Sequence, residues 1–194
     1  MKTDQHTYDE VMLDWAIAEL LSPTWMEFWN SPLCEELRTK LKNEGIDSLS
    51  VYERTWLIAR LVNFRYVIIL EYGPSHYWSF KKRTFSCEAL SGFSIIHQFN
   101  YPPSFSFGQL SKKIREHPAR GPIVDEPAMR ERARKMLDLS SRGQEPFGFP
   151  IAIERPAPMP PVLIEGYKRS MVALWAGCPS MEIYLCTPPT ATVP

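Results

Sequence analysis

Two cationic residues, Lys168 and Arg169, closely follow a glycine, Gly166, at the boundary between two predicted elements. The residues before the glycine, 162–164, are Val-Leu-Ile, an apolar run typical of a short buried strand. Residues 170–176 have the pattern of a helix. The sequence therefore predicts a strand, a tight turn and a helix in direct succession, with basic groups where the helix begins.

Lysine and arginine are unfavourable at a helix N-terminus, which already carries partial positive charge, unless an anion is bound there. Backbone N–H groups, a glycine without a side chain and an arginine fork together form a site suited to phosphate. We therefore predict that phosphate oxygens contact the segment Gly166, Tyr167, Lys168, Arg169 and Ser170. The same pattern also fits a solvated turn in which the arginine pairs with a nearby carboxylate.

A reaction at this turn would need a carboxylate to hold Mg²⁺ or to position a nucleophile. Glu165 directly precedes the glycine and is the candidate catalytic residue, although alternation along a strand could point it away. It is also the candidate partner for the arginine. Asp125 and Glu126 are the alternative magnesium candidates. The four cysteines lack the paired spacing of a zinc site, so no structural zinc is expected.

Further features accompany the turn along the chain. After it come Ala173, an Ala-Gly pair at 176–177 and a predicted strand at 182–186. Before it come a charged helix near 126–139, Ser-Arg-Gly at 141–143 and a Pro-Ile strand at 150–153. With the segment Ile164-Glu165-Gly166-Tyr167-Lys168-Arg169-Ser170, this order resembles the ParB/sulfiredoxin-like superfamily, over roughly residues 108–186. In that family a Gly-x-x-Arg turn between strand and helix holds nucleotide phosphates.

The resemblance implies an α+β fold with a small mixed sheet, and a bound nucleotide such as ATP or CTP, with Mg²⁺ as a further candidate. Two departures limit what carries over. Sulfiredoxins have a catalytic cysteine where this chain has Tyr167, so sulfinic-acid repair by this residue is excluded. The partition proteins have Glu-Arg-Arg where this chain has Tyr167-Lys168-Arg169, so only Arg169 matches and the CTP-clamp mechanism is in doubt. NTP hydrolysis or phosphoryl transfer stays a hypothesis.

The chain of 194 residues is 44% hydrophobic and 23% charged, which predicts a globular protein able to bury a substantial core. Its net charge is zero, which disfavours a protein held mainly by nucleic acid or by an anionic membrane. Charge is uneven, however: residues 1–50 have a net charge of −6 and residues 111–135 a net charge of +4. The absence of a leader pattern or a long apolar run predicts a cytoplasmic protein.

Residues 7–64 have the pattern of a helical block, with Thr7 or Asp9, Ser31 and Ser50 as candidate N-caps. We expect a helical N-terminal extension over 1–65, a ParB/sulfiredoxin-like α+β domain over 66–186 and a proline-rich tail over 187–194. The helical block is a candidate surface for a protein partner or for self-association.

Three segments leave alternatives open. Residues 66–70 fit either a strand or the end of a helix. Residues 76–83 interleave aromatic and basic side chains, which fits an edge strand better than a nucleobase platform. Residues 93–99 predict a strand that contains His97. A catalytically inactive binding module, or a DNA-binding partition-like accessory protein, are the functional alternatives to a nucleotide-binding protein.

Overall fold

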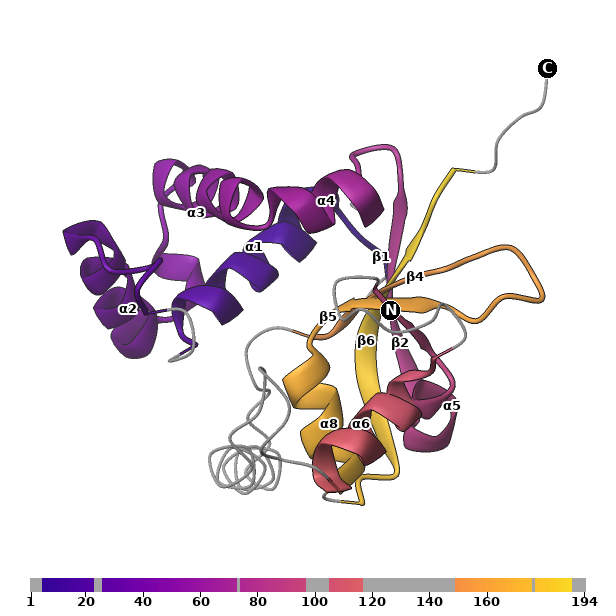
Figure 1. Cartoon of the computed structure of the whole chain (residues 1–194). Coiled ribbons are helices and arrows are strands. Elements are labelled where there is room, and N and C mark those ends of the chain that lie inside the picture. Colours follow the sequence, from indigo (N-terminus) through magenta and orange to yellow (C-terminus); the bar gives the residue numbers. More distant parts are fainter. Residues whose placement is uncertain are drawn as a thin grey trace. The chain divides into compact units, whose positions relative to one another are not determined.

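The computed structural model describes residues 5–22, 26–72, 74–96, 105–116, 149–175 and 177–189, without the side chains of Tyr72, Ile114, Arg115 and Lys168. The chain divides into two compact units (Figure 1). One unit is Thr7–His76, and the other combines Met1–His6 with Tyr77–Pro194. The predicted α+β fold class is confirmed, because the described residues form helices and one mixed sheet.

The Thr7–His76 unit is helical. Its elements are α1 (Tyr8–Leu20), α2 (Pro32–Glu44), the 3₁₀ turn η2 (Ile46–Ser48), α3 (Val51–Phe64) and α4 (Tyr66–Tyr72). The predicted caps at Thr7, Ser31 and Ser50 are confirmed. Thr7 and Ser50 each form a capping box, in which the cap side chain and a glutamate three residues later satisfy each other's backbone N–H groups. These caps fix where each helix begins.

Buried charged side chains hold the helical unit together. The Arg38 guanidinium donates from Nε to the Leu20 carbonyl at 2.9 Å and from Nη2 to the Trp29 carbonyl. Arg65 pairs with the buried carboxylate of Glu19. Trp29 is fully buried in the core of this unit.

The other unit is built on a six-stranded sheet with the order β1-β2-β6-β4-β5-β3. The strands are β1 (Gln5–His6), β2 (Ser79–Ser86), β3 (Ser94–Ile95), β4 (Ile151–Ile153), β5 (Val162–Glu165) and β6 (Ser180–Thr187). Antiparallel pairing joins β2 to β6 over eight residue pairs and β4 to β5, whereas β4 runs parallel to β6 and β3 parallel to β5.

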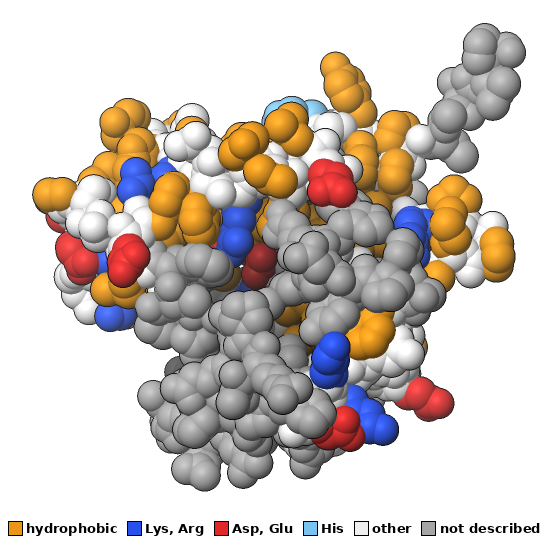
Figure 2. All heavy atoms as spheres, viewed as in Figure 1, with side chains coloured by type: hydrophobic (Ala, Val, Ile, Leu, Met, Phe, Trp, Pro, Cys, Tyr) orange, Lys and Arg blue, Asp and Glu red, His pale blue; other side chains and the backbone are white. Residues whose placement is uncertain are grey.

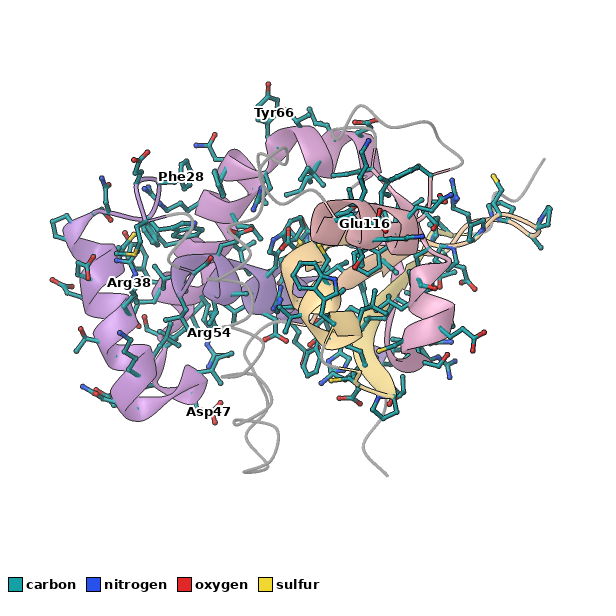
Figure 3. The ribbon with its side chains drawn as sticks, turned by 60° about the horizontal axis from the view of Figure 1, so that its bottom comes forward. Phe28, Arg38, Asp47, Arg54, Tyr66 and Glu116 are labelled. Atoms are coloured by element: carbon teal, nitrogen blue, oxygen red, sulfur yellow. The ribbon has the colours of Figure 1, made fainter. Side chains whose placement is uncertain are left out.

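In the described part of this unit, three helices flank the sheet: α5 (Cys87–Ser91), α6 (Phe107–Glu116) and α8 (Tyr167–Trp175). Helices α6 and α8 lie side by side (Figures 1 and 3), and the Trp175 indole N–H donates to the Ser111 hydroxyl at 2.9 Å. The rings of Phe107 and Tyr167 lie 6.1 Å apart at the same helix pair. The two contacts therefore join α6 to both ends of α8.

The structure decides one open alternative and corrects other predicted elements. Residues 66–70 belong to helix α4, because the chain continues helically past Arg65, whose carbonyl accepts the Ile69 N–H at 2.9 Å. Strand β2 is not an edge strand throughout, since β1 pairs with its residues Phe80 and Lys81. The strand predicted over 93–99 is observed only as Ser94–Ile95, and His97 lies outside the described residues.

Candidate functional site

The strand that leads into the candidate site is buried on both sides. Val162, Leu163 and Ile164 are each 4% exposed or less, and β5 lies between β4 and β3 in the sheet. A strand covered on both faces reads as a continuous apolar run rather than an alternating one. The predicted strand is therefore confirmed, and it extends one residue further than its apolar part, to Glu165.

Gly166 makes the whole turn between β5 and α8. Its φ is +85°, in the left-handed region that favours glycine. A Cβ built on it would lie 2.6 Å from both Cα and Cβ of Pro150, the residue that precedes β4. Gly166 thus forms a tight turn. Its backbone also packs closely against Pro150, which leads into a neighbouring strand of the same sheet.

Helix α8 begins earlier than predicted, at Tyr167 rather than at Ser170. The reason is that one residue at positive φ completes the turn, so no further connecting residue is needed. Lys168 and Arg169 therefore belong to the first turn of the helix itself. The first N–H groups of any α-helix have no acceptor within that helix, and its dipole adds partial positive charge at this end.

Tyr167 is anchored in the core by its hydroxyl. The phenol is 8% exposed, and its O–H donates to the Leu163 carbonyl. The same oxygen accepts the backbone N–H of Ile96, which follows β3, at 3.0 Å. Tyr167 therefore ties β5 and the end of β3 to the first turn of α8, a role that the sequence analysis missed because the residues it joins are far apart in the chain.

Arg169, in the first turn of α8, and Glu165, the last residue of β5, lie close together. Arg169 Nη2 is 3.9 Å from Glu165 Oε1, and the two side chains are 18% and 19% exposed. At this separation the contact is an ion pair rather than a hydrogen bond. The structure therefore brings the candidate catalytic carboxylate beside the candidate phosphate-binding guanidinium, as the second interpretation of the turn requires.

Ser170 completes the first turn of α8. Its N–H donates to the Gly166 carbonyl at 2.9 Å, which closes the first helical hydrogen bond. Its side chain is fully buried, and Oγ has no hydrogen-bond partner among the described residues. A buried hydroxyl without a partner costs free energy, so it is a group that an additional ligand atom could satisfy.

Three predicted site groups cannot be placed. Asp125 and Glu126 lie outside the described residues, and so does the side chain of Lys168. Within the described ranges, no three His, Cys, Asp or Glu side chains gather in a way that could hold a metal ion. Glu165 is therefore the one carboxylate from the predicted set that the structure locates at the turn.

An aromatic cluster lies one residue from the contact that Gly166 makes with Pro150. Phe149 precedes Pro150, and its ring centroid is 3.8 Å from Lys82 Nζ, within the range of a cation–π contact. The Tyr184 ring lies 5.5 Å from the Phe149 ring at an edge-on angle of 82°. The segment 76–83 thus supplies a lysine to this cluster, and its aromatic partners come from elsewhere in the chain.

An open hollow of about 520 Å³ lies between α6, α8 and the end of α5, lined by residues that include Ser91, Lys112 and Trp175. It is at the C-terminal end of α8. A nine-residue helix is about 14 Å long, so this hollow is separate from the turn at Gly166. The hollow therefore adds nothing to the phosphate-binding hypothesis.

Comparisons with known proteins gave no match to a family model, to a curated protein or to a solved structure. In the part of the chain that the structure describes, no helix combines the length and apolar character needed to cross a bilayer.

Proposed function

We propose that this protein binds a nucleotide, whose phosphates lie against the first turn of α8 between Gly166 and Ser170. The observation that carries the proposal is the direct succession of β5, a glycine at φ +85° and α8. This arrangement leaves no side chain on the turn itself, where the N-terminal N–H groups and the helix dipole favour an anion. Arg169, in the same turn, supplies a guanidinium suited to bidentate contact with phosphate.

The buried hydroxyl of Ser170 supports the same proposal. It lies in the first turn of α8 without a hydrogen-bond partner among the described residues. A phosphate oxygen at this turn would offer an acceptor to that hydroxyl.

The order of elements also supports nucleotide binding, by way of the resemblance to ParB/sulfiredoxin-like domains. Strand β4, strand β5, the Gly166 turn, helix α8 and strand β6 follow one another as the resemblance implies. Gly166 and Arg169 occupy the glycine and arginine of the Gly-x-x-Arg turn. The resemblance suggests ATP or CTP as the ligand, with Mg²⁺ as its companion ion.

Glu165 is the residue that would connect binding with chemistry. It lies beside Arg169 and close to the turn, so it could position a water or another nucleophile against a bound phosphate. The reaction would then be NTP hydrolysis or phosphoryl transfer. Its negative charge would also repel the same phosphate, so binding and turnover must be measured separately.

A second candidate function is a protein-interaction module without catalytic activity. Two observations favour it. Gly166 is already explained by its contact with Pro150, and Arg169 is already close to a carboxylate. In the helical unit, Tyr66, Val67 and Leu70 of α4 are 57%, 46% and 80% exposed. Figure 2 shows hydrophobic side chains over α4, and Figure 3 shows Tyr66 pointing away from the helix.

Calorimetric titration of the purified full-length chain with ATP, CTP and ADP, with and without Mg²⁺, tests the proposal. Arg169→Ala should weaken the binding of the preferred nucleotide by about 10- to 100-fold, the loss expected for a charge-assisted hydrogen bond. The matched control is Arg83→Ala, which removes the same side chain from an exposed position on β2.

Comparison of Arg169→Ala with Arg83→Ala separates the loss of a phosphate contact from a general effect of removing an arginine. Retained folding by circular dichroism, with binding lost only in Arg169→Ala, would support the phosphate site. Equal affinity in both variants, or no heat with any nucleotide, would contradict the proposal and favour the interaction module. The DNA-binding alternative predicts binding to duplex DNA that weakens as salt rises.

A further inference from the structure

Cys178 is held in place by the end of helix α8. Gly177 has φ +71° and donates its N–H to the Leu174 carbonyl at 3.2 Å, and Cys178 donates its N–H to the Ala173 carbonyl at 3.0 Å. These two bonds form a Schellman motif, the commonest way in which a glycine ends a helix. The backbone of Cys178 is therefore fixed by hydrogen bonds to the last turn of α8.

Cys87 is held beside the same segment by the register of β2 and β6. Ser86 and Ser180 are the last residue pair of these two strands. The next residue, Cys87, donates its N–H to the Pro179 carbonyl at 3.1 Å. Cys87 is thus hydrogen-bonded to the residue that follows Cys178, so the two cysteines lie on adjoining segments of the chain.

The two thiols also differ from the other cysteines in exposure. None of the four cysteines forms a disulfide in the structure, and Cys34 and Cys186 are fully buried whereas Cys87 and Cys178 are partly exposed. Burial and then repulsion from the Cys178 thiolate raise the pKa of the Cys87 thiol. Deeper burial raises the pKa of Cys186 to about 12, which keeps that thiol unreactive.

We propose that Cys87 and Cys178 are a modification site, a thiol pair that a peroxide oxidises to an intramolecular disulfide. One thiolate attacks hydrogen peroxide, giving a sulfenic acid and releasing one oxygen of the peroxide as water. The second thiol then displaces the hydroxyl of the sulfenic acid as a second water, and the S–S bond forms. Together the two thiols lose two electrons and two protons. The peroxide takes up the electrons and the protons and becomes two molecules of water.

The disulfide would join the start of α5 to the end of α8. The Gly166 turn lies at the N-terminus of α8. Oxidation would therefore link the C-terminal end of the same helix covalently to the start of α5. A thiol reductant would reverse the link. The proposal does not depend on nucleotide binding, because it rests on the backbone contacts of residues 87 and 177–179 and on the exposure of the two thiols.

The test is disulfide mapping of the full-length protein after treatment with hydrogen peroxide. Digestion with trypsin and chymotrypsin separates the cysteines, because cleavage after Tyr184 divides Cys178 from Cys186. We expect one linked peptide pair containing Cys87 and Cys178, two hydrogen masses lighter than the reduced pair. Free thiol at these two positions should disappear faster than at the buried cysteines, and faster at pH 9 than at pH 7, because the thiolate is the reactive form.

Three serine variants complete the test. Cys87→Ser and Cys178→Ser should each abolish the link, whereas Cys34→Ser, the control, should leave it unchanged. Linkage of either cysteine to a different one would overturn the proposal. So would oxidation of both to sulfinic acid without a linked peptide. Because mapping of the unmodified sequence decides between these outcomes, the proposal stays testable if a variant fails to fold.

Discussion

Gly166 and Pro150 are packed so closely that a single added methyl group at the glycine would lie 2.6 Å from Cα and Cβ of the proline. The contact joins the turn after β5 to the residue that leads into β4. Pro150 in turn accepts the Tyr184 N–H through its carbonyl at 2.8 Å, which connects the turn to β6. The candidate site is therefore built into the pairing of three strands, and its geometry depends on the absence of a side chain at residue 166.

Gly166→Ala should accordingly destabilise the protein. The alanine would have to keep a positive φ, which costs about 1–2 kcal/mol, and its methyl group would overpack Pro150 at a cost of about 1–3 kcal/mol. Gly177→Ala is the matched control, because Gly177 has φ +71° but no atom within 4 Å of the added Cβ. Urea unfolding should show a clearly larger loss for Gly166→Ala, and equal losses would contradict the packing argument.

Tyr167→Phe tests the second structural role at the turn. The change removes a buried hydroxyl and leaves the Ile96 N–H without its acceptor at 3.0 Å. An unsatisfied buried donor costs about 1–3 kcal/mol, so the free energy of unfolding should fall by that amount. Tyr52→Phe, at a tyrosine that is 71% exposed, is the control and should change stability by less than about 0.5 kcal/mol. A neutral Tyr167→Phe would mean that the hydroxyl contributes no net stability.

These two residues show what the sequence could and could not predict about the site. The turn at Gly166 and the helix end at Gly177 were predictable, because a glycine between a strand and a helix acts through its own backbone. The contacts with Pro150 and Ile96 were not, because they join residues 16 and 71 positions apart. The sequence therefore predicted Gly166 and Tyr167 as ligand contacts. The structure also gives Gly166 a packing role against Pro150 and Tyr167 a hydrogen-bonding role with Ile96.

The same distinction holds for the rest of the fold. The caps at Thr7 and Ser50 were predictable because each is satisfied by a glutamate three residues away. Residues 66–70 were ambiguous because a β-branched run fits both a strand and a buried helix, and the continuation past Arg65 decided it. The pairing of Gln5 and His6 with β2 could not be predicted, since two residues carry no periodicity.

Glu53 should make stability depend on pH in the helical unit. The carboxylate accepts the Ser50 N–H at 2.6 Å and hydrogen bonds from the Lys40 ammonium, and these contacts lower the pKa of Glu53 to about 2. Because folding lowers this pKa, the stabilisation is complete above the unfolded value near 4.5 and is lost as the pH falls toward 2.

Glu53→Gln tests this dependence while keeping a capping-box side chain, since glutamine also serves at that position. At pH 7 the variant should be less stable by up to about 1 kcal/mol, the upper end of the range for surface ion pairs, since the Lys40–Glu53 pair is partly exposed. Thermal unfolding at pH 7, 4 and 2.5 should show the difference from the unmodified protein shrinking. Glu36→Gln, an exposed glutamate on α2, is the control. A difference that stays constant with pH would contradict the assignment.

Glu165→Gln separates the two roles that the candidate site gives to its carboxylate. Glu165 Oε1 is 3.9 Å from Arg169 Nη2, so its negative charge competes with a phosphate for the guanidinium and also repels the phosphate directly. Removing one unit charge at such a distance is worth on the order of 1 kcal/mol, or about fivefold in the dissociation constant. Calorimetry should therefore show tighter nucleotide binding by Glu165→Gln in the absence of Mg²⁺.

Phosphate release by the same variant then reports on catalysis. If Glu165 positions the nucleophile, tighter binding should accompany a large fall in the rate of phosphate release, whereas an unchanged rate would show that it has no catalytic role. Weaker binding that appears only when Mg²⁺ is present would instead make Glu165 a ligand of the metal. Weaker binding in the absence of Mg²⁺ would contradict the electrostatic argument, because removal of a neighbouring negative charge cannot by itself repel a phosphate.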